Sequence, residues 1–554
     1  MKKTLFLLAM LIALPMAAQQ SSFEKFKQQK QGEFDRFKEK QQADFDAFRQ
    51  RINEEYAEFM RQKWEAFPVH KAEKPIEEIE VPPVIYEEHN ELEDESPAPA
   101  PVPATVPEPA PAPQPQEKPL SQEEQKPQPK PEPKPQEAEQ PLPKETINPL
   151  TAPTPTIDTK PVQIAVKPKV VVIPTPPPAP EPIAPVKPKE EPYKKVSVSY
   201  FGTIITIGFP VNDDLKLAAV KESAVSDAWK QLSDKRYDIT ISTALKARQA
   251  NALCDWAYMK MLQAVTEKQY GKTNEAVLMQ AFLMMQSGYR IRMAMSDKKL
   301  YMLVASLYNI FDMPYYELDG FKFYDISGDD AQLHITKAKY DKEKSLSLQM
   351  SKLPQLGSEP TPKRTLTSKK GVTSAACVNK NLIDFFNTYP QACFNDDQTT
   401  RWAAYANTPL EQSVKDILYP PLKKVINGMS EKEAVGILLN WVQTAFEYEY
   451  DDKVWGRDRA FFAQETLYYP YCDCEDRSIL FSRLVRDLTG LDVVLLYYPG
   501  HLAAAVAFND DVKGDYLTYK NRKYVVCDPT YINAGVGRTM PKMNNQQAQI
   551  IALK

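Results

Sequence analysis

The stretch Tyr471-Cys-Asp-Cys-Glu-Asp-Arg-Ser478 decides how the C-terminal part of this 554-residue chain is interpreted. It opens a helix-like apolar run from Ile479 to Leu488. A thiol in the first turn of a helix lies near unpaired backbone N–H groups and the positive end of the helix dipole, and both favour the reactive thiolate. Cys474 has that position, whereas Cys472 lies just outside it.

Two later residues complete a catalytic set. His501 lies in YYPGHLAAAV, 27 residues after Cys474, and Asp528 lies in KYVVCDPTY, another 27 residues on. These spacings fit a helix, a turn and a strand, then a polar hairpin and the next strand. Adjacent antiparallel strands would place His501 beside Asp528. We therefore predict a thiol nucleophile, its base, and a carboxylate that orients the base, with the backbone N–H of Cys474 as an oxyanion donor.

The order of a thiol at a helix start, a His on one strand and an Asp on the next resembles the transglutaminase-like branch of the papain-like fold. The resemblance covers residues from about Asn379 to Asn533 and is sharpest in CEDRSILFSRLV, GH and DPT. It implies an α+β fold in which Cys474 attacks an amide carbonyl. Because bacterial members are more often hydrolases, it implies an exported cysteine protease or amidase acting on peptide or isopeptide bonds. A transamidase and a non-enzymatic envelope adaptor with this fold are the alternatives.

Other interpretations of the site stay open. Cys472, Cys474, His501 and Cys527 could form a metal site, although CxC spacing is less usual for structural zinc than CxxC. The fold could also have lost its activity. No calcium-ligand motif is evident, so we expect neither a metal nor another cofactor. Glu475 and Asp476 favour the helix start but oppose a nearby thiolate, so a reactive Cys474 requires that their side chains point away from the sulfur.

Weaker site candidates precede Cys474. Gln464 lies ten residues earlier and could donate to the oxyanion, although that spacing is longer than the usual papain-like arrangement. Trp455, Tyr469 and Tyr471 could line a substrate groove. Packing within the loop explains these aromatic residues equally well.

Residues 196–335 are interpreted as a degenerate copy of the same module, ahead of a linker at 336–375 and a catalytic domain at 376–554. LCDWAYMKMLQAV resembles LLNWVQTAFEYEY, and the following helix and strands recur in the same order. In that alignment Asn274 stands at the position of Cys474 and Lys299 at that of His501, while Asp325 echoes Asp528. Asn and Lys cannot perform thiol–imidazole chemistry, so only the second module is expected to be catalytic.

An 11-residue repeat occupies residues 23–67, within a predicted amphipathic helix at 19–67. Its two aromatic rows are Phe23, Phe34, Phe45, Tyr56 and Phe67, and Phe26, Phe37, Phe48 and Phe59. Eleven residues make three helical turns at ~3.67 residues per turn, so both rows stay on one face of a helix or right-handed coiled coil. We expect this face to mediate self-association or to dock on an envelope partner, or else to pack back on the globular part.

Residues 68–195 hold 35 of the chain's 49 prolines. Such a composition predicts a disordered proline-rich linker, either a spacer or a simple tether. Residues 1–18, MKKTLFLLAMLIALPMAA, have two lysines, an apolar core and small exit residues, which predicts a signal peptide and export to the periplasm, the cell envelope or the medium.

The overall composition excludes some classes of partner. A net charge of -4 gives no electrostatic footprint for nucleic acid, and no later apolar run suggests a transmembrane span. A protein or peptide substrate is the expected partner. Six cysteines are too few for a disulfide scaffold; Cys377 and Cys393 could form a bridge, or could both be small buried residues.

Overall fold

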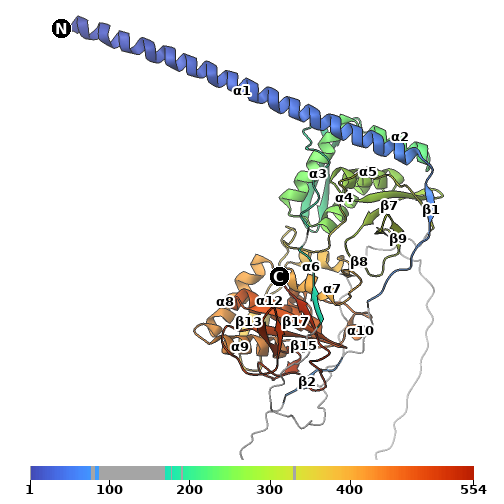
Figure 1. Ribbon diagram of the computed structural model, residues 1–554, viewed down its shortest axis with the longest axis vertical. Coiled ribbons are helices and arrows are strands. Elements are labelled where there is room, and N and C mark those ends of the chain that lie inside the picture. The colour runs from blue at the N-terminus through green and yellow to red at the C-terminus, as the bar shows by residue number, and fades with distance from the viewer. Residues whose placement is uncertain (1, 76–80, 87–168, 176, 189–190, 329–331) are drawn as a thin grey trace, which may run out of the picture.

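The computed structural model describes residues 2–75, 81–86, 169–175, 177–188, 191–328 and 332–554, with the backbone alone for 2–24. Figure 1 shows two α+β bodies, with the N-terminal helix lying across one of them and extending well beyond it. The expected α+β class is confirmed at this level. We call residues 191–350 the first module and residues 358–554 the second module.

Helix α1 (Lys2–Arg61) docks on the first module through its C-terminal part. Tyr56 stacks on Trp229 of α2 (Glu222–Leu232), with ring centroids 4.9 Å apart. Arg49 donates to Asp238 over 2.6 Å, and both side chains are buried. This part of the helix therefore packs back on the globular part, which is one of the outcomes expected from the sequence.

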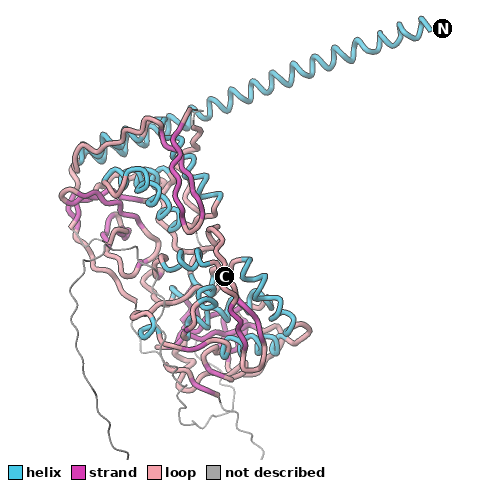
Figure 2. Tube along the Cα trace, turned by 180° about the vertical axis from the view of Figure 1, so that it is seen from behind, coloured by secondary structure: helices cyan, strands magenta, loops and turns pink. Residues whose placement is uncertain are grey.

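The aromatic repeat is divided between burial and exposure. Toward the N-terminus the side chains of Phe26, Phe34 and Phe37 are more than half exposed. In Figure 2 this part of α1 points away from both modules. The helix ends at Arg61, six residues before the end of the repeat at Phe67. Phe67, the last residue of the repeat, lies instead in strand β1 (Glu65–Phe67).

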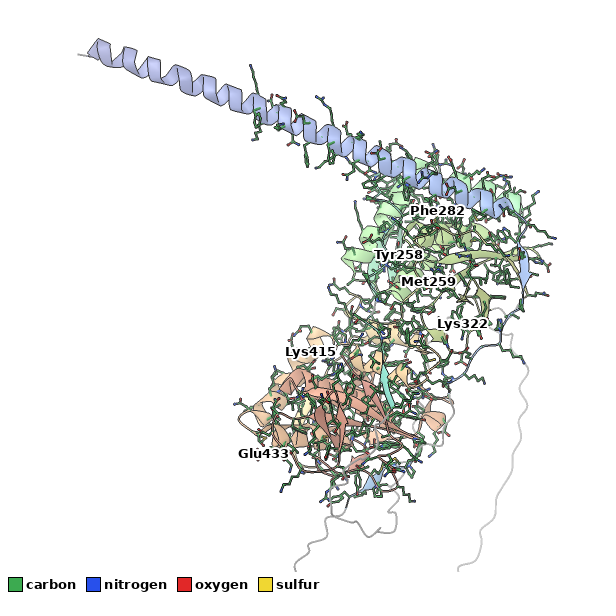
Figure 3. The ribbon with its side chains drawn as sticks, viewed as in Figure 1. Tyr258, Met259, Phe282, Lys322, Lys415 and Glu433 are labelled. Atoms are coloured by element: carbon green, nitrogen blue, oxygen red, sulfur yellow. The ribbon has the colours of Figure 1, made fainter. Side chains whose placement is uncertain are left out.

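The first module packs helices against one face of a six-stranded sheet of order β1-β11-β6-β7-β10-β9. Tyr258, Met259 and Phe282, which Figure 3 labels, belong to this helical layer, and their side chains are buried. The remaining elements are η1 (Lys235–Tyr237), α3 (Asp238–Ala250), α4 (Asp255–Tyr270), α5 (Asn274–Gln286), β4 (Tyr193–Tyr200), β5 (Thr203–Pro210), β6 (Ile291–Ser296), β7 (Lys299–Ala305), β8 (Asn309–Ile310), β9 (Tyr315–Leu318), β10 (Phe321–Asp325) and β11 (Leu333–Ile335).

The second module is built around α12 (Cys474–Thr489), which packs on a sheet of order β19-β20-β18-β17-β22-β3. The sheet strands are β3 (Lys169–Val172), β17 (Asp492–Tyr498), β18 (His501–Ala507), β19 (Tyr516–Tyr519), β20 (Arg522–Cys527) and β22 (Gln549–Ala552). The other elements are β12 (Arg364–Thr367), β13 (Thr373–Ala376), α6 (Lys380–Asn387), β14 (Ala392–Cys393), α7 (Thr400–Asn407), α8 (Gln412–Ile426), α9 (Glu431–Thr444), β15 (Glu447–Tyr448), α10 (Asp451–Val454), α11 (Ala463–Tyr468), β16 (Tyr471–Cys472) and β21 (Tyr531–Ile532).

The two sheets have the same strand order. From edge to edge, the first sheet runs β1, β11, the hairpin β6–β7, and then β10 and β9. The second sheet runs β3, β22, the hairpin β17–β18, and then β20 and β19. The central hairpins also share their register, because Ser296 pairs with Lys299 in one and Tyr498 with His501 in the other.

The ends of the proline-rich region are part of the fold rather than free linker. β3 pairs in parallel with β22, and β2 (Val84–Ile85) pairs in parallel with β21. Near residue 183 the returning chain binds the first module, where the N–H of Ile183 donates to the carbonyl of Gln286 over 3.1 Å. The central part of the predicted linker, residues 87–168, lies outside the described residues.

The segment 336–375 also differs from the expected linker. Glu343 is buried and pairs with Arg292 over 2.8 Å, so this stretch completes the first module. The hairpin of β12 and β13 then packs on α8 and belongs to the second module. Among the described residues, no helix combines the length and the apolar character that a bilayer crossing requires.

Candidate active site

The helix start that holds Cys474 is fixed by a reciprocal cap. Asp473 is the N-cap residue; its side chain accepts from the N–H of Asp476, and the carboxylate of Asp476 accepts from the N–H of Asp473. Gly490, with φ of 74°, ends the helix in the left-handed conformation that a side chain disfavours. Cys474 is therefore the first helical residue, as the sequence predicts, and its side chain is buried.

His501 and Asp528 form the closest pair of the predicted set. Nε2 of His501 lies 2.9 Å from Oδ2 of Asp528. The other oxygen of Asp528 accepts from the backbone N–H groups of Thr530 and Tyr531, at 2.8 and 3.2 Å. A carboxylate only accepts hydrogen bonds, so in the neutral imidazole Nε2 carries the proton and Nδ1 presents its lone pair. Within the described part of the chain, this buried Nδ1 atom has no hydrogen-bond partner.

Helix α12 lies against the strand that begins with His501. Ser478, one turn after Cys474, donates its hydroxyl to the carbonyl of Leu502 over 2.8 Å. The thiol of Cys474 is directed differently: its Sγ donates to Oε2 of Glu475 over 3.3 Å. The structure thus brings the helix start next to the strand of His501 and joins His501 to Asp528, while the thiol and Nδ1 are not hydrogen-bonded to each other.

A group of buried and half-buried carboxylates lies at the helix start. Ligand oxygens of Asp451, Asp458 and Glu475 lie within 4.8 Å of one another. The pKa of Glu475 is raised mainly by burial, and the second cause is the negative charge of Asp458. Burial also raises the pKa of Asp451 and of Asp476 well above the usual range. Such raised pKa values keep these groups protonated to higher pH, which reduces the charge that opposes a thiolate.

A reactive Cys474 was expected to need the side chains of Glu475 and Asp476 turned away from its sulfur, and only Asp476 has this orientation. Asp476 turns away from the sulfur, because its Oδ1 accepts from the N–H of Phe461 over 2.8 Å. Glu475 does not, since it accepts from the thiol itself. Arg401, which is buried, donates to Asp458 over 2.7 Å, and its positive charge opposes the rise in the pKa of Glu475. Arg401 could not be predicted from the sequence, because its contact with Asp458 is formed across 57 residues.

The alternative metal set receives no geometric support from the described residues. The groups there whose ligand atoms could share an ion are carboxylate-rich, the other two being Asp473 with Cys474 and Glu475, and Asp451 with Asp473 and Asp476. Cys472 instead donates to the carbonyl of Glu447 over 3.6 Å, and Cys527 to that of Val525 over 3.6 Å. No disulfide joins any of the six cysteines, all of which lie in the described residues, so Cys377 and Cys393 are not bridged.

The weaker candidates have partners of their own. Gln464 is buried, with Oε1 accepting from the N–H of Glu411 and Nε2 donating to its carboxylate, at 3.1 and 3.3 Å. Tyr469 packs on Trp455, with ring centroids 4.9 Å apart, and donates to Asn387. Tyr471 lies in β16, paired with Glu447. These contacts account for the residues as parts of the loop structure.

Two residues that the sequence did not indicate hold the site in place. Gln443 of α9 places Nε2 within 3.0 Å of the carbonyls of Asp528, Tyr531 and Ala534, and so fixes the loop after β20. Arg477, from the same stretch as Cys474, is buried and donates to the carbonyls of Gln443 and Phe446 at the end of α9. A single Gln in a helix carries no sequence signal for such a role.

The residues of the first module that the sequence alignment pairs with Cys474 and His501 are also neighbours. Asn274 begins α5, and its amide binds the carbonyl of Lys298 and the N–H of Leu300, both at 2.9 Å, on either side of Lys299. Asp325 pairs with Leu303, four residues after Lys299, whereas Ala505, four residues after His501, pairs with Val526. By strand register, Asp325 therefore stands two residues ahead of the position of Asp528.

Comparisons of the chain with protein-family models, with curated proteins and with solved structures found no match.

Proposed function

We propose that this chain is an exported thiol hydrolase of the transglutaminase-like class that cleaves peptide or isopeptide amide bonds. The observation that carries the proposal is the buried pair of His501 and Asp528, 2.9 Å apart, with Nδ1 of His501 left for a further partner. The helix that starts with Cys474 lies against the same strand through Ser478. These contacts support the roles of nucleophile for Cys474, base for His501 and orienting carboxylate for Asp528.

The chemistry follows from those positions. The thiol turns from Glu475 to His501 and loses its proton to Nδ1, and the thiolate attacks the amide carbonyl. The backbone N–H of Cys474 at the helix start stabilises the oxyanion. His501 then returns the proton to the leaving amine, which gives an acyl-enzyme. Water releases the acid in a hydrolase; an amine would release a new amide in a transamidase.

We also infer that the first module is a copy of the same fold without the chemistry. The shared strand order and hairpin register of the two sheets support this inference. Asn274 and Lys299 occupy the positions of Cys474 and His501, and neither can form a thiolate–imidazolium pair.

A non-enzymatic envelope adaptor is the second candidate, and the burial of the site favours it. Cys474, His501 and Asp528 are each only 2% exposed, and the thiol is bound to Glu475. The two candidates differ in the reactivity of one atom. Alkylation of Cys474 by iodoacetamide at neutral pH, compared in wild type and His501→Ala, separates them: a rate that depends on His501 supports the hydrolase, and an inert thiol supports the adaptor.

A further inference from the structure

A short segment at the start of the proline-rich region lies against the loops that carry His501 and Asp528. We call this segment, residues 81–86 (VPPVIY), the strap. At one end the N–H of Val81 donates to the carbonyl of Gly500 over 3.0 Å, and Gly500 directly precedes His501. At the other end the N–H of Tyr86 donates to the carbonyl of Ile532 over 2.7 Å.

The strap also extends a strand. Its residues Val84 and Ile85 form β2, which pairs in parallel with β21, and β21 begins three residues after Asp528. In the described part of the chain β21 pairs with no strand other than β2. Without the strap, β21 would present an open edge, which an extended peptide can complete through main-chain hydrogen bonds.

The side chains of the strap hold it loosely. The ring of Tyr86 meets that of Tyr531 edge to face, with centroids 5.6 Å apart, and the guanidinium of Arg538 lies 5.6 Å from the centroid of Tyr86. Val84 and Tyr86 pack on the apolar cluster of Tyr531, Ala534 and Met540. None of the six strap residues is fully buried, so the segment can leave without opening the core.

We propose that β21 and the carbonyl of Gly500 form a peptide-binding edge, that its ligand is an extended peptide rich in apolar and proline residues, and that the strap occupies this edge within the same chain. The inference rests on the proposed function, because the edge flanks the His501–Asp528 pair on both sides and so would place a substrate beside it. A peptide from another molecule can bind only where the strap has left the edge. Its apparent affinity is therefore the intrinsic affinity multiplied by the fraction of protein in which the strap is released.

Two matched variants test the proposal in full-length protein carrying Cys474→Ala, so that binding is measured without chemistry. Val81→Pro with Tyr86→Pro removes both donated N–H groups but keeps an extended backbone. Val81→Ile with Tyr86→Phe keeps both donors and serves as the control. The probe is a fluorescein-labelled VPPVIY peptide followed by fluorescence anisotropy, with a labelled Gly-Ser hexapeptide as the control ligand.

We expect the proline variant to bind VPPVIY at least about tenfold more tightly than the control variant, and to bind the Gly-Ser peptide weakly. A third variant, with residues 81–86 replaced by Gly-Ser repeats, gives the same result if the prolines impair folding, as judged by thermal melting. Equal affinity in all variants that melt cooperatively, or no binding, overturns the proposal. Failure of the proposed function looks different: the released variant binds the peptide, yet Cys474 in otherwise wild-type protein does not react.

Discussion

Nε2 of His501 and Oδ2 of Asp528 lie 2.9 Å apart, at the start of β18 and directly after the end of β20. The antiparallel pairing of Ala504 with Cys527 brings these strand ends together. The carboxylate is itself held by two backbone N–H groups of the following turn. The imidazole is therefore fixed in one tautomer and one orientation.

Replacing Asp528 with Asn should lower the rate of peptide hydrolysis by about 10²- to 10⁴-fold. An amide NH₂ facing Nε2 forces the proton onto Nδ1, so His501 can no longer accept the thiol proton. The measurement is the initial rate with a fluorogenic peptide pool, with Asp510→Asn as the control, since Asp510 is exposed. An unchanged rate in Asp528→Asn would contradict the orienting role.

Asp451→Asn should stabilise the protein as the pH rises. Burial raises the pKa of Asp451 well above its usual range, with further contributions from Asp476 and Glu475. The folded chain then binds more protons than the unfolded chain, so this group's contribution to stability is complete below the usual carboxyl pKa and is lost as the pH rises through the raised pKa. We expect the variant's melting temperature to exceed that of wild type by about 2–4 °C at neutral pH, with little gain at pH ~4.

Asp452→Asn is the matched control for that experiment, because Asp452 is the exposed neighbour of Asp451 on α10. Melting curves from pH ~4 to ~8 should be the same for this variant and wild type. If the two Asn variants shifted the melting temperature alike at every pH, burial of Asp451 would not be the cause.

Gly288→Ala should destabilise the chain more than Gly490→Ala. Both glycines follow the central helix of a module and have positive φ, of 91° and 74°, so each substitution costs about 1 kcal/mol in backbone strain. A Cβ at Gly288 would also clash with the carbonyl oxygen of Glu181, whereas a Cβ at Gly490 would have no described atom beyond its chain neighbours within 4 Å. Displacing the returning chain adds about 1–3 kcal/mol, measurable by urea unfolding.

Equal losses of stability in the two Ala variants would contradict a close contact between Gly288 and the returning chain at Glu181. Faster proteolysis near residue 183 in Gly288→Ala alone would support the contact independently, since Ile183 is bonded to Gln286 at the same place.

Phe34→Ser with Phe37→Ser should reduce self-association of the full chain. These side chains are 51% and 62% exposed on the part of α1 that extends beyond the first module, so they are available to a second helix. Light scattering after size exclusion would show a lower mass at equal concentration. Arg36→Ser with Glu39→Ser is the control, because both residues are exposed and lie on the opposite side of the same helix. An unchanged mass in both variants would contradict self-association through the face of Phe34 and Phe37.

Sequence patterns located the elements whose boundaries depend on local signals. The sequence predicts a helix at Asn274–Gln286 and a strand at DVVLLYY, and α5 and β17 have these bounds. The sequence also predicts a single helix from Ser242 to Lys268. The structure has two helices there, α3 and α4, because Ala252 adopts a φ of 47° between them. The sequence predicts a strand over YFGTIITIGF, but β5 starts only at Thr203, because Phe201 and Gly202 have positive φ and form a tight turn.

Contacts between distant segments could not be predicted from the sequence. β1, β2 and β3 are two to four residues long, and each finds its partner more than 260 residues away, so local propensity says nothing about them. In the site, the spacing of His501 and Asp528 was sufficient to predict their pairing. The partner of the thiol was not predictable, because the choice between Glu475 and His501 depends on one side-chain rotation.

The reactivity of the Cys474 thiol tests the central claim most directly. The protein is incubated at neutral pH with an electrophilic VPPVIY peptide, and the modified cysteine is identified by mass spectrometry in wild type, Cys472→Ala, His501→Ala and the strap variant Val81→Pro with Tyr86→Pro. We predict an adduct on Cys474 that persists in Cys472→Ala, forms faster in the strap variant and is lost in His501→Ala. An unmodified Cys474 in every variant, in protein whose half-buried Cys377 reacts under the same conditions, would contradict the proposed hydrolase.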